Sequence, residues 1–149
     1  MDLELMRQIA EELIPFNRFL GLKVVEIRHG FASFLIPWRD ELVGDPMKGA
    51  MHGGVISMLA DTVGGMAVWS ALSNPMARVS TIDLRVDYLR PGKQESLLAE
   101  AHTVRVGKTV GVADVRLFQM SDPAATVATG KGVYAIRVFK GTEAAATGE

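Results

Sequence analysis

The chain has 149 residues, of which 48% are hydrophobic and 22% charged, as is typical of one soluble globular domain. Lys and Arg number 16, and Asp and Glu number 17. The resulting net charge of −1 excludes a general electrostatic attraction to nucleic acid or anionic membranes, although it does not exclude a local basic patch. The absence of cysteine from the sequence excludes disulfides, thiolate nucleophiles and cysteine-based metal sites.

Neither a targeting signal nor a membrane span is indicated. Residues 1–4 are acidic and amphipathic, unlike the basic start of a secretory signal peptide. The longest apolar stretch, residues 55–72, is broken by polar residues that include Asp61, whereas a membrane span needs about 20 nearly uncharged residues. We therefore expect a cytoplasmic protein with no nucleic-acid partner and no membrane partner.

The first part of the chain predicts short helices followed by a hairpin. Pro15 interrupts a helix whose apolar residues recur every three or four positions, and Gly21 would stop a second short turn. Strands at Lys23–Arg28 and Phe31–Ile36 would be joined by a turn that contains Gly30. The apolar stripe of the first helix consists of Met6, Ile9, Ala10 and Leu13.

A loop is expected at residues 37–50, followed at residues 52–72 by a helix that is apolar on all sides. Such a helix is buried in the core of a protein. The pattern then changes to period two, which predicts a strand with one face formed by Ile82, Leu84, Val86 and Tyr88. Further strands are predicted at about residues 96–106, 110–120 and 126–138.

One buried helix followed by consecutive antiparallel strands predicts an α+β fold, in which a curved antiparallel sheet wraps around residues 52–72. A single domain would span residues 1–140, and residues 141–149 would form a disordered tail. One sheet from one chain cannot cover a helix that is apolar on every side. We therefore expect at least a dimer.

Two adjacent glycines at the start of the predicted helix need an explanation, because glycine costs a helix about 1 kcal/mol relative to alanine. Gly53 and Gly54 follow His52, and the first N–H groups of a helix have no partner within it. These glycines could present their N–H groups to an oxyanion, since no side chain obstructs the approach. A tight turn where the helix packs on the sheet is the alternative explanation.

Asp61 is the only charged side chain between His52 and Leu72. A buried carboxylate must be paired, hydrogen-bonded or protonated, so Asp61 is either a satisfied core residue or a catalytic carboxylate. It follows His52 by nine residues, which on a helix means about 13 Å of rise and opposite faces. In a twofold dimer, however, His52 and Gly53 of one chain could meet Asp61 of the other.

Residues 51–61, with the sequence MHGGVISMLAD, resemble the signature of the hotdog-fold acyl-CoA thioesterases, in the phenylacetyl-CoA thioesterase (PaaI-like) group. Residues 15–21 and 80–91 are also similar to segments of that family, and Gly107-Lys108 stands where the family has a similar turn. The resemblance implies the hotdog fold, with an antiparallel sheet wrapped around one long central helix. It also implies a homodimer with one continuous sheet, and a dimer of dimers, which is a homotetramer.

The resemblance further implies the roles of individual residues in hydrolysing an acyl-CoA to free acid and CoA. Gly53 would offer its N–H to the thioester oxygen, with His52 placing or polarising the group. Asp61 of the partner chain would activate water or attack directly, and Thr81 would help to position the water. No cofactor or metal is implied, since coenzyme A is part of the substrate.

Two positions do not agree fully with this assignment. Many relatives have an Asn before His-Gly-Gly, where this chain has Asp45-Pro46. An ionised Asp45 cannot donate a hydrogen bond to an oxyanion and is expected only to shape the loop. Thr81 alternates away from the face that contains Ile82, so it would point elsewhere unless it lies at a strand end or on a bulge.

The remaining candidate site residues would bind substrate. These are Gly54, Arg90 and Lys108, the two cations being suited to the phosphates of coenzyme A, although most such charges are merely solvated. The three histidines have no metal-ligand spacing, so no metal site is expected. Two alternative functions stay open at this point, a hotdog-fold hydratase or dehydratase acting on acyl-CoA, and a non-catalytic acyl-CoA-binding protein.

Overall fold

A computed structural model describes residues 2–74 and 76–138 of the chain. The predicted tail at residues 141–149 lies outside the described residues. The helical elements are α1 (Leu3–Gln8), the π-helical segment η1 (Ile9–Leu13), α2 (Pro15–Leu20), the 3-10 turn η2 (Asp40–Leu42) and the long helix α3 (Gly53–Ser70). The strands are β1 (Lys23–Arg28), β2 (Phe31–Ile36), β3 (Val43–Asp45), β4 (Ala50–Met51), β5 (Ala77–Tyr88), β6 (Leu97–Val106), β7 (Val110–Gln119) and β8 (Asp122–Val138).

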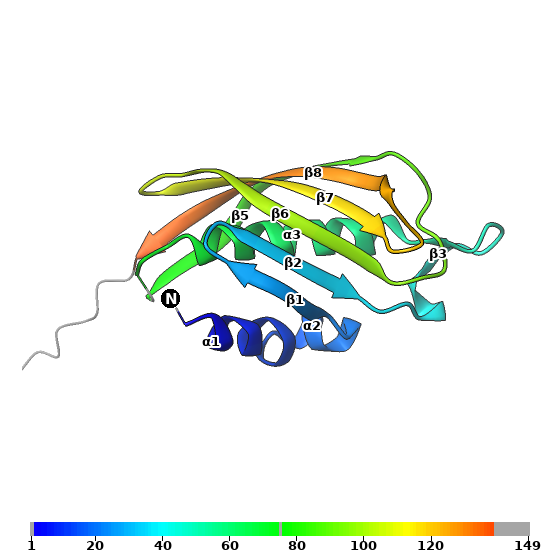
Figure 1. The fold of residues 1–149 in the computed structure, drawn as a ribbon, viewed down its shortest axis with the longest axis horizontal. Coiled ribbons are helices and arrows are strands. Elements are labelled where there is room, and N and C mark those ends of the chain that lie inside the picture. Colours follow the sequence, from blue (N-terminus) through cyan, green and yellow to red (C-terminus); the bar gives the residue numbers. More distant parts are fainter. Residues whose placement is uncertain (1, 75, 139–149) are drawn as a thin grey trace, which may run out of the picture.

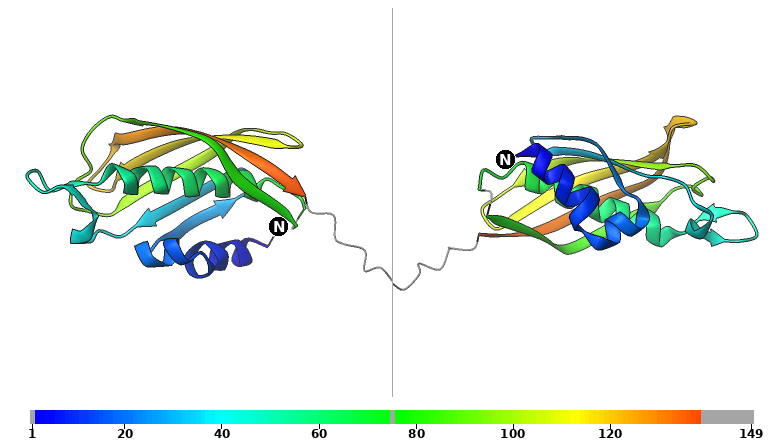
Figure 2. Two further views of the ribbon diagram at one scale, coloured as in Figure 1. Left: turned by 180° about the vertical axis from the view of Figure 1, so that it is seen from behind. Right: turned by 90° about the horizontal axis from the view of Figure 1, so that it is seen from below.

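Six strands form one antiparallel sheet in the order β1-β2-β6-β7-β8-β5, while β3 and β4 pair separately. The sheet curves around α3, and the amino-terminal helices lie on the side of α3 that faces away from the middle of the sheet (Figure 1). Figure 2 shows the same arrangement from behind and from below. The predicted α+β architecture, a sheet wrapped around one long helix, is confirmed.

The core lies between α3 and the concave face of the sheet. Leu59, Val63 and Ala67 of α3 are fully buried, as are Phe34 of β2 and Leu117 of β7. Burying a Leu, Val or Phe side chain contributes about 1.5–3 kcal/mol each, so this face of α3 holds the helix against the sheet.

A second face of α3 is only partly buried in the single chain. Its residues recur at intervals of three and four, which places them in one stripe along the helix: Met58, Asp61, Thr62, Gly65 and Trp69. The sheet therefore covers one side of the helix that the sequence predicted to be buried all round. The other side, which carries Asp61, defines where a functional site can form.

The amino-terminal helix differs from the continuous α-helix that was predicted. The Ile14 N–H donates to the Ile9 carbonyl at 3.1 Å, an i→i+5 bond that defines the π-helical turn η1. The wider turn changes the helical period, so Met6 and Ala10 are buried while Leu13 is 60% exposed. The prediction of one apolar stripe was thus correct for its first turns and wrong for Leu13.

Strand β5 contains a β-bulge that shifts its alternation. Thr81 pairs with Tyr134 of β8 and Asp83 pairs with Val133, so Ile82 is the extra residue on β5. Ile82 is consequently 58% exposed. The prediction that it shares a face with Leu84 was wrong. The bulge turns Thr81 toward α3, which is the exception that the sequence argument allowed.

The hairpin and the end of α2 agree with prediction. β1 and β2 have the predicted bounds, and Gly21 ends α2 in the left-handed conformation, with φ 69°. Strand β8 is longer than predicted and begins at Asp122. Its first residues lie beyond the end of β5 and pair only with β7, through a shifted register. The loop predicted at residues 37–50 contains η2 and the short strands β3 and β4.

Candidate functional site

The first turn of α3 is capped by a histidine. His52 is the N-cap, and its Nδ1 atom accepts a hydrogen bond of 2.8 Å from the Gly54 N–H. Because Nδ1 accepts, the neutral ring carries its proton on Nε2, which leaves a donor on the exposed side chain. The N–H of Gly54, predicted to bind substrate, is engaged in this cap. Gly53, the first residue of the helix, has an N–H that the helix itself cannot use.

Tyr88, at the end of β5, lies against the same turn. Its hydroxyl donates to the Gly53 carbonyl at 3.2 Å and shares a hydrogen bond with the Ser57 hydroxyl. A Cβ atom on Gly53 would come within 3.3 Å of the Tyr88 ring, so glycine permits this close approach. The period-two pattern predicted that Tyr88 lies on a strand face, whereas its contact with the start of α3 has no signal in that pattern.

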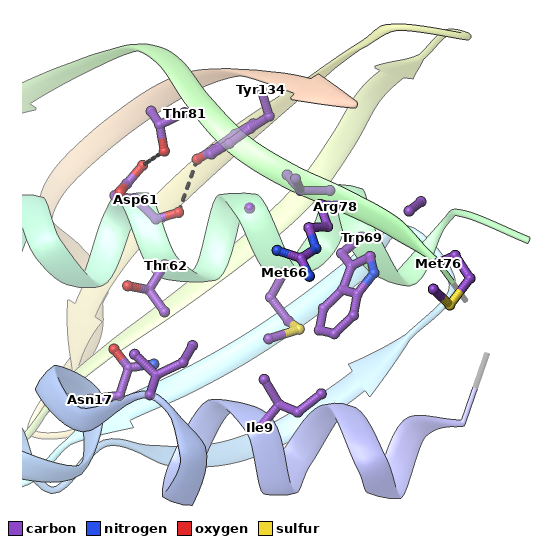
Figure 3. A pocket seen from close by; sticks show the side chains of 14 residues that line it. Ile9, Asn17, Asp61, Thr62, Met66, Trp69, Met76, Arg78, Thr81 and Tyr134 are labelled. Carbon is purple, nitrogen blue, oxygen red and sulfur yellow. Dashed lines mark hydrogen bonds between the residues drawn. The ribbon is translucent and has the colours of Figure 1, made fainter. Parts of the chain in front are cut away.

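Asp61, two turns further along α3, is held by a side chain from β5. The Thr81 hydroxyl donates to Asp61 Oδ1 at 2.7 Å (Figure 3). A hydrogen bond to a carboxylate is stronger than one between neutral groups and fixes the orientation of the acid. The structure thus brings together two of the predicted catalytic residues, and it does so through the β-bulge.

Tyr134 of β8 packs beneath Asp61 and was not among the predicted site residues. Its hydroxyl donates to the Asp61 carbonyl at 3.1 Å, and its side chain is 1% exposed. Burial, with a smaller contribution from the Asp61 charge, raises the pKa of the Tyr134 phenol far above its ordinary value of 10.0. Tyr134 therefore stays neutral and remains a donor. The sequence held one signal for it, the pair Gly64-Gly65 in mid-helix, which gives the ring room.

A cavity of about 760 Å³ opens beside Asp61. Asp61, Thr81 and Tyr134 line it at one end, and Asn17 and Thr62 also border it (Figure 3). The apolar part of its lining comes from three segments: Ile9 of η1 with Ile14 just after it, Met66 and Trp69 of α3, and Val79 of β5 with Met76 just before that strand. A carboxylate at the end of an apolar cavity of this size is typical of a site for a small organic substrate.

Not all predicted residues meet in one chain. His52, Gly53 and Gly54 do not line the cavity that contains Asp61. Because α3 is unbroken over Gly53–Ser70, the predicted separation of about 13 Å along the helix applies. Arg90 follows β5 at one end of the sheet and Lys108 lies in the β6–β7 turn at the other, so one chain does not bring both cations to one site (Figure 1).

Asp45 shapes a turn, as expected. Its Oδ1 atom accepts from the Met47 N–H at 3.0 Å and from the Lys48 N–H at 3.3 Å, which leaves it no donor role. Within the described residues, no group of three or more His, Asp or Glu side chains could hold a metal ion. None of the helices described at residues 2–74 and 76–138 is long and apolar enough to cross a membrane.

Residues 48–125 match the family model of the thioesterase superfamily, a segment that contains His52, Gly53, Asp61 and Thr81. A candidate esterase of Halobacterium salinarum is 44% identical over 128 residues, covering 82% of this chain and 83% of that protein. The medium/long-chain acyl-CoA thioesterase YigI of Escherichia coli is 35% identical over 127 residues, covering 77% of this chain and 82% of YigI. The chain therefore belongs to the thioesterase superfamily and is a thioester hydrolase.

Solved structures agree with this assignment. A thioesterase-superfamily protein of known crystal structure superposes with a TM-score of 0.80 at 34% identity, over 89% of this chain and 96% of that one. The Escherichia coli PaaI protein superposes with a TM-score of 0.70 at 26% identity, over 79% of this chain and 80% of that one. The predicted resemblance to the hotdog-fold, PaaI-like thioesterases is confirmed.

Proposed function

We propose that this protein is an acyl-CoA thioesterase whose active site is assembled from two chains. The relative YigI is named as a thioesterase for medium and long acyl-CoA, which supports an acyl-CoA substrate. The observation that carries the proposal is the Asp61 carboxylate, oriented by Thr81 and placed at the end of a largely apolar cavity.

The proposed site requires a dimer, which would form by pairing of the β5 edge strands of two chains. This strand has 12 residues and is an edge of the sheet, and Ile82 at its bulge is 58% exposed. A long edge strand with an exposed apolar side chain is a template for pairing with another strand. Two copies of β5 related by a twofold axis would join the two sheets into one, and two such dimers would form the tetramer that the family resemblance implies.

The positions of two contacts along β5 suggest how the site is completed. Thr81 lies beside Asp61, and Tyr88 lies beside Gly53. If Thr81 of one β5 strand stands opposite Tyr88 of the other, Gly53 of one chain faces Asp61 of its partner. The twofold axis then produces two identical sites, each with His52 and Gly53 from one chain and Asp61 from the other.

In this site the residues would divide the chemistry of hydrolysis. Asp61 takes a proton from water as the water oxygen attacks the thioester carbon, and Thr81 holds the carboxylate. The Gly53 N–H, with His52 Nε2–H, donates to the oxygen that becomes negative. The carbon–sulfur bond then breaks, the thiolate of CoA leaves and takes up a proton, and the free acid remains. Direct attack by Asp61 on the thioester carbon is the alternative mechanism. Of the two candidate cations for the CoA phosphates, Arg90 is the one that follows Tyr88 and so lies at the Gly53 end of β5.

The test is thiol release from a panel of acyl-CoAs by the parent protein and by Asp61→Asn. The variant should lose at least about a hundredfold in kcat, the scale of general-base catalysis. Asp114→Asn is the matched control, because Asp114 is an exposed carboxylate paired with Lys131. Since the chain has no cysteine, it contributes no thiol to the signal.

A second experiment tests whether two chains share a site. Gly53→Pro removes the proposed N–H donor at a position that accepts proline, because proline is tolerated at the first position of a helix and His52 already has the extended backbone that precedes proline. It also adds a Cβ atom 3.3 Å from the Tyr88 ring, a contact that an alanine at this position reproduces. Gly53→Ala keeps the N–H and is its control. Mixing inactive Gly53→Pro and Asp61→Asn chains should restore about a quarter of the parent activity, since half of the randomly formed dimers would contain one intact site.

The outcomes separate the alternatives. No restoration on mixing, with each variant inactive alone and subunit exchange demonstrated, would contradict the shared site. Loss of conjugated absorbance from an enoyl-CoA, with no thiol release from any ester, would instead indicate a hydratase. Tight binding of acyl-CoA without turnover would indicate a binding protein.

A further inference from the structure

The cavity beside Asp61 has a definite direction. Asp61 and Thr81 stand at one end and Trp69 and Met76 at the other (Figure 3). Trp69 follows Asp61 by eight residues on α3, which corresponds to a rise of about 12 Å. A substrate whose reacting carbonyl lies at Asp61 would therefore extend along α3 toward the indole of Trp69.

The length of the cavity corresponds to a limited number of carbon atoms. An extended chain advances about 1.2 Å per bond, as an extended polypeptide does over its three backbone bonds per residue. A distance of about 12 Å thus accommodates about ten bonds. The volume of about 760 Å³ lies within the range of sites that bind small organic ligands.

The wall opposite α3 is the amino-terminal helical segment. The π-helical turn η1 places Ile9 and Ile14 on the cavity while Leu13, between them in sequence, is 60% exposed. The segment is braced internally, since buried Asn17 of α2 donates from Nδ2 to the Ala10 carbonyl of η1 at 2.9 Å.

A hydrogen bond and buried side chains fix this segment to the edge of the sheet and to the core. The Val24 N–H of β1 donates to Glu11 Oε1 at 2.8 Å, and Met6 and Ala10 are buried in the core. Elements held by buried contacts open at a high free-energy cost. The amino-terminal segment is therefore a fixed wall of the cavity.

We propose that this wall and Trp69 form the acyl pocket, and that the pocket selects acyl chains of about eight to ten carbons. This inference rests on the proposed thioesterase function. Ile9 and Ile14 set the width of the pocket, and Trp69 sets its depth. Each methylene group buried should raise kcat/KM about fourfold until the pocket is filled.

The first test is a chain-length profile of kcat/KM with saturated acyl-CoAs from two to sixteen carbons. For the parent protein, kcat/KM should rise with chain length and then level off or decline beyond about ten carbons. Trp69→Ala should move the optimum to longer chains, and Ile9→Trp should move it to shorter ones. Leu13→Trp is the matched control, because it adds the same side chain to the same segment at an exposed position.

The second test does not depend on turnover. The chain has two tryptophans, so Trp38→Phe leaves Trp69 as the only tryptophan fluorophore. In the Asp61→Asn background, 10-bromodecanoyl-CoA should quench Trp69 fluorescence more strongly than 2-bromodecanoyl-CoA does, because its bromine would lie at the Trp69 end.

The two tests also distinguish the failure of this inference from failure of the proposed function. Hydrolysis with a profile that Trp69→Ala and Ile9→Trp leave unchanged would overturn the pocket and keep the thioesterase. Equal quenching of Trp69 fluorescence by the two bromoacyl esters would also overturn the proposed pocket. Faster hydrolysis of an ω-carboxylated ester than of the saturated ester of equal length would overturn it too. If no ester is hydrolysed, the proposed function fails, and the quenching result alone decides whether the pocket binds acyl chains.

Discussion

Gly64, in the middle of α3, is a position where a single added methyl group should destabilise the protein. A Cβ atom built there would lie closer than 3.0 Å to the Tyr134 hydroxyl and 3.1 Å from Cζ of the same ring. Tyr134 is 1% exposed and hydrogen-bonded to the Asp61 carbonyl, so it has little freedom to move aside. Gly64→Ala therefore forces either the ring or the helix out of place.

The magnitude follows from three contributions. Overpacking in a core costs about 1–3 kcal/mol, and loss of the hydrogen bond from Tyr134 costs about 1 kcal/mol. Alanine returns about 1 kcal/mol because it favours helix over glycine. We expect the free energy of unfolding to fall by about 1–3 kcal/mol, with Tm lower by about 2–4 °C for each kcal/mol.

The assay is urea unfolding at fixed protein concentration, with Gly65→Ala as the control. A Cβ atom on Gly65 would lie 3.3 Å from the Tyr134 ring, a tight contact but a longer one than at Gly64, and alanine favours the helix by about 1 kcal/mol, so this change should cost less than Gly64→Ala. In a Tyr134→Phe background, Gly64→Ala should cost at least about 1 kcal/mol less, since the clashing hydroxyl is gone. The reasoning would be refuted if Gly64→Ala left the free energy of unfolding unchanged, or if it lowered that free energy equally in the parent and in the Tyr134→Phe background.

Two further predictions concern the residues around Asp61. Thr81→Val removes the hydrogen bond to the carboxylate and should lower kcat about tenfold with little change in KM, whereas Thr81→Ser should retain activity; equal activity of both variants would contradict the positioning role. Because burial raises the pKa of Tyr134, its contribution to stability should be complete below the ordinary value of 10.0 and should be lost as pH rises above it. Urea unfolding between pH 8 and 11 should show a smaller alkaline loss for Tyr134→Phe than for the parent, and parallel curves would exclude this contribution.

Local chemistry explains the elements that the sequence predicted well. The apolar run after His52 defined α3 to within two residues at each end. Gly21 in the left-handed conformation ended α2, and the turn with Gly30 at φ 71° joined the first hairpin. Each of these signals acts between residues that are close in the chain, so the sequence displays it directly.

The contacts around the candidate site were harder to predict because they join distant segments. Tyr134 contacts Asp61 although the two residues are 73 positions apart in the chain. The only sequence signal for this contact was Gly64-Gly65, which leaves room for a large side chain beside α3. The π-helical turn that brings Ile9 to the cavity has no counterpart in a pattern based on 3.6 residues per turn.

The sequence by itself determined the central helix, the order of strands and helix, and the family motif that contains His52, Gly53 and Asp61. Only the tertiary structure decided that Thr81 would hold Asp61, because the bulge at Ile82 depends on how β5 registers against β8. It also decided where the apolar cavity lies, since that space exists only once the amino-terminal helices are anchored beside α3. Periodicity shows which side chains share a face, whereas packing between distant segments determines what that face meets.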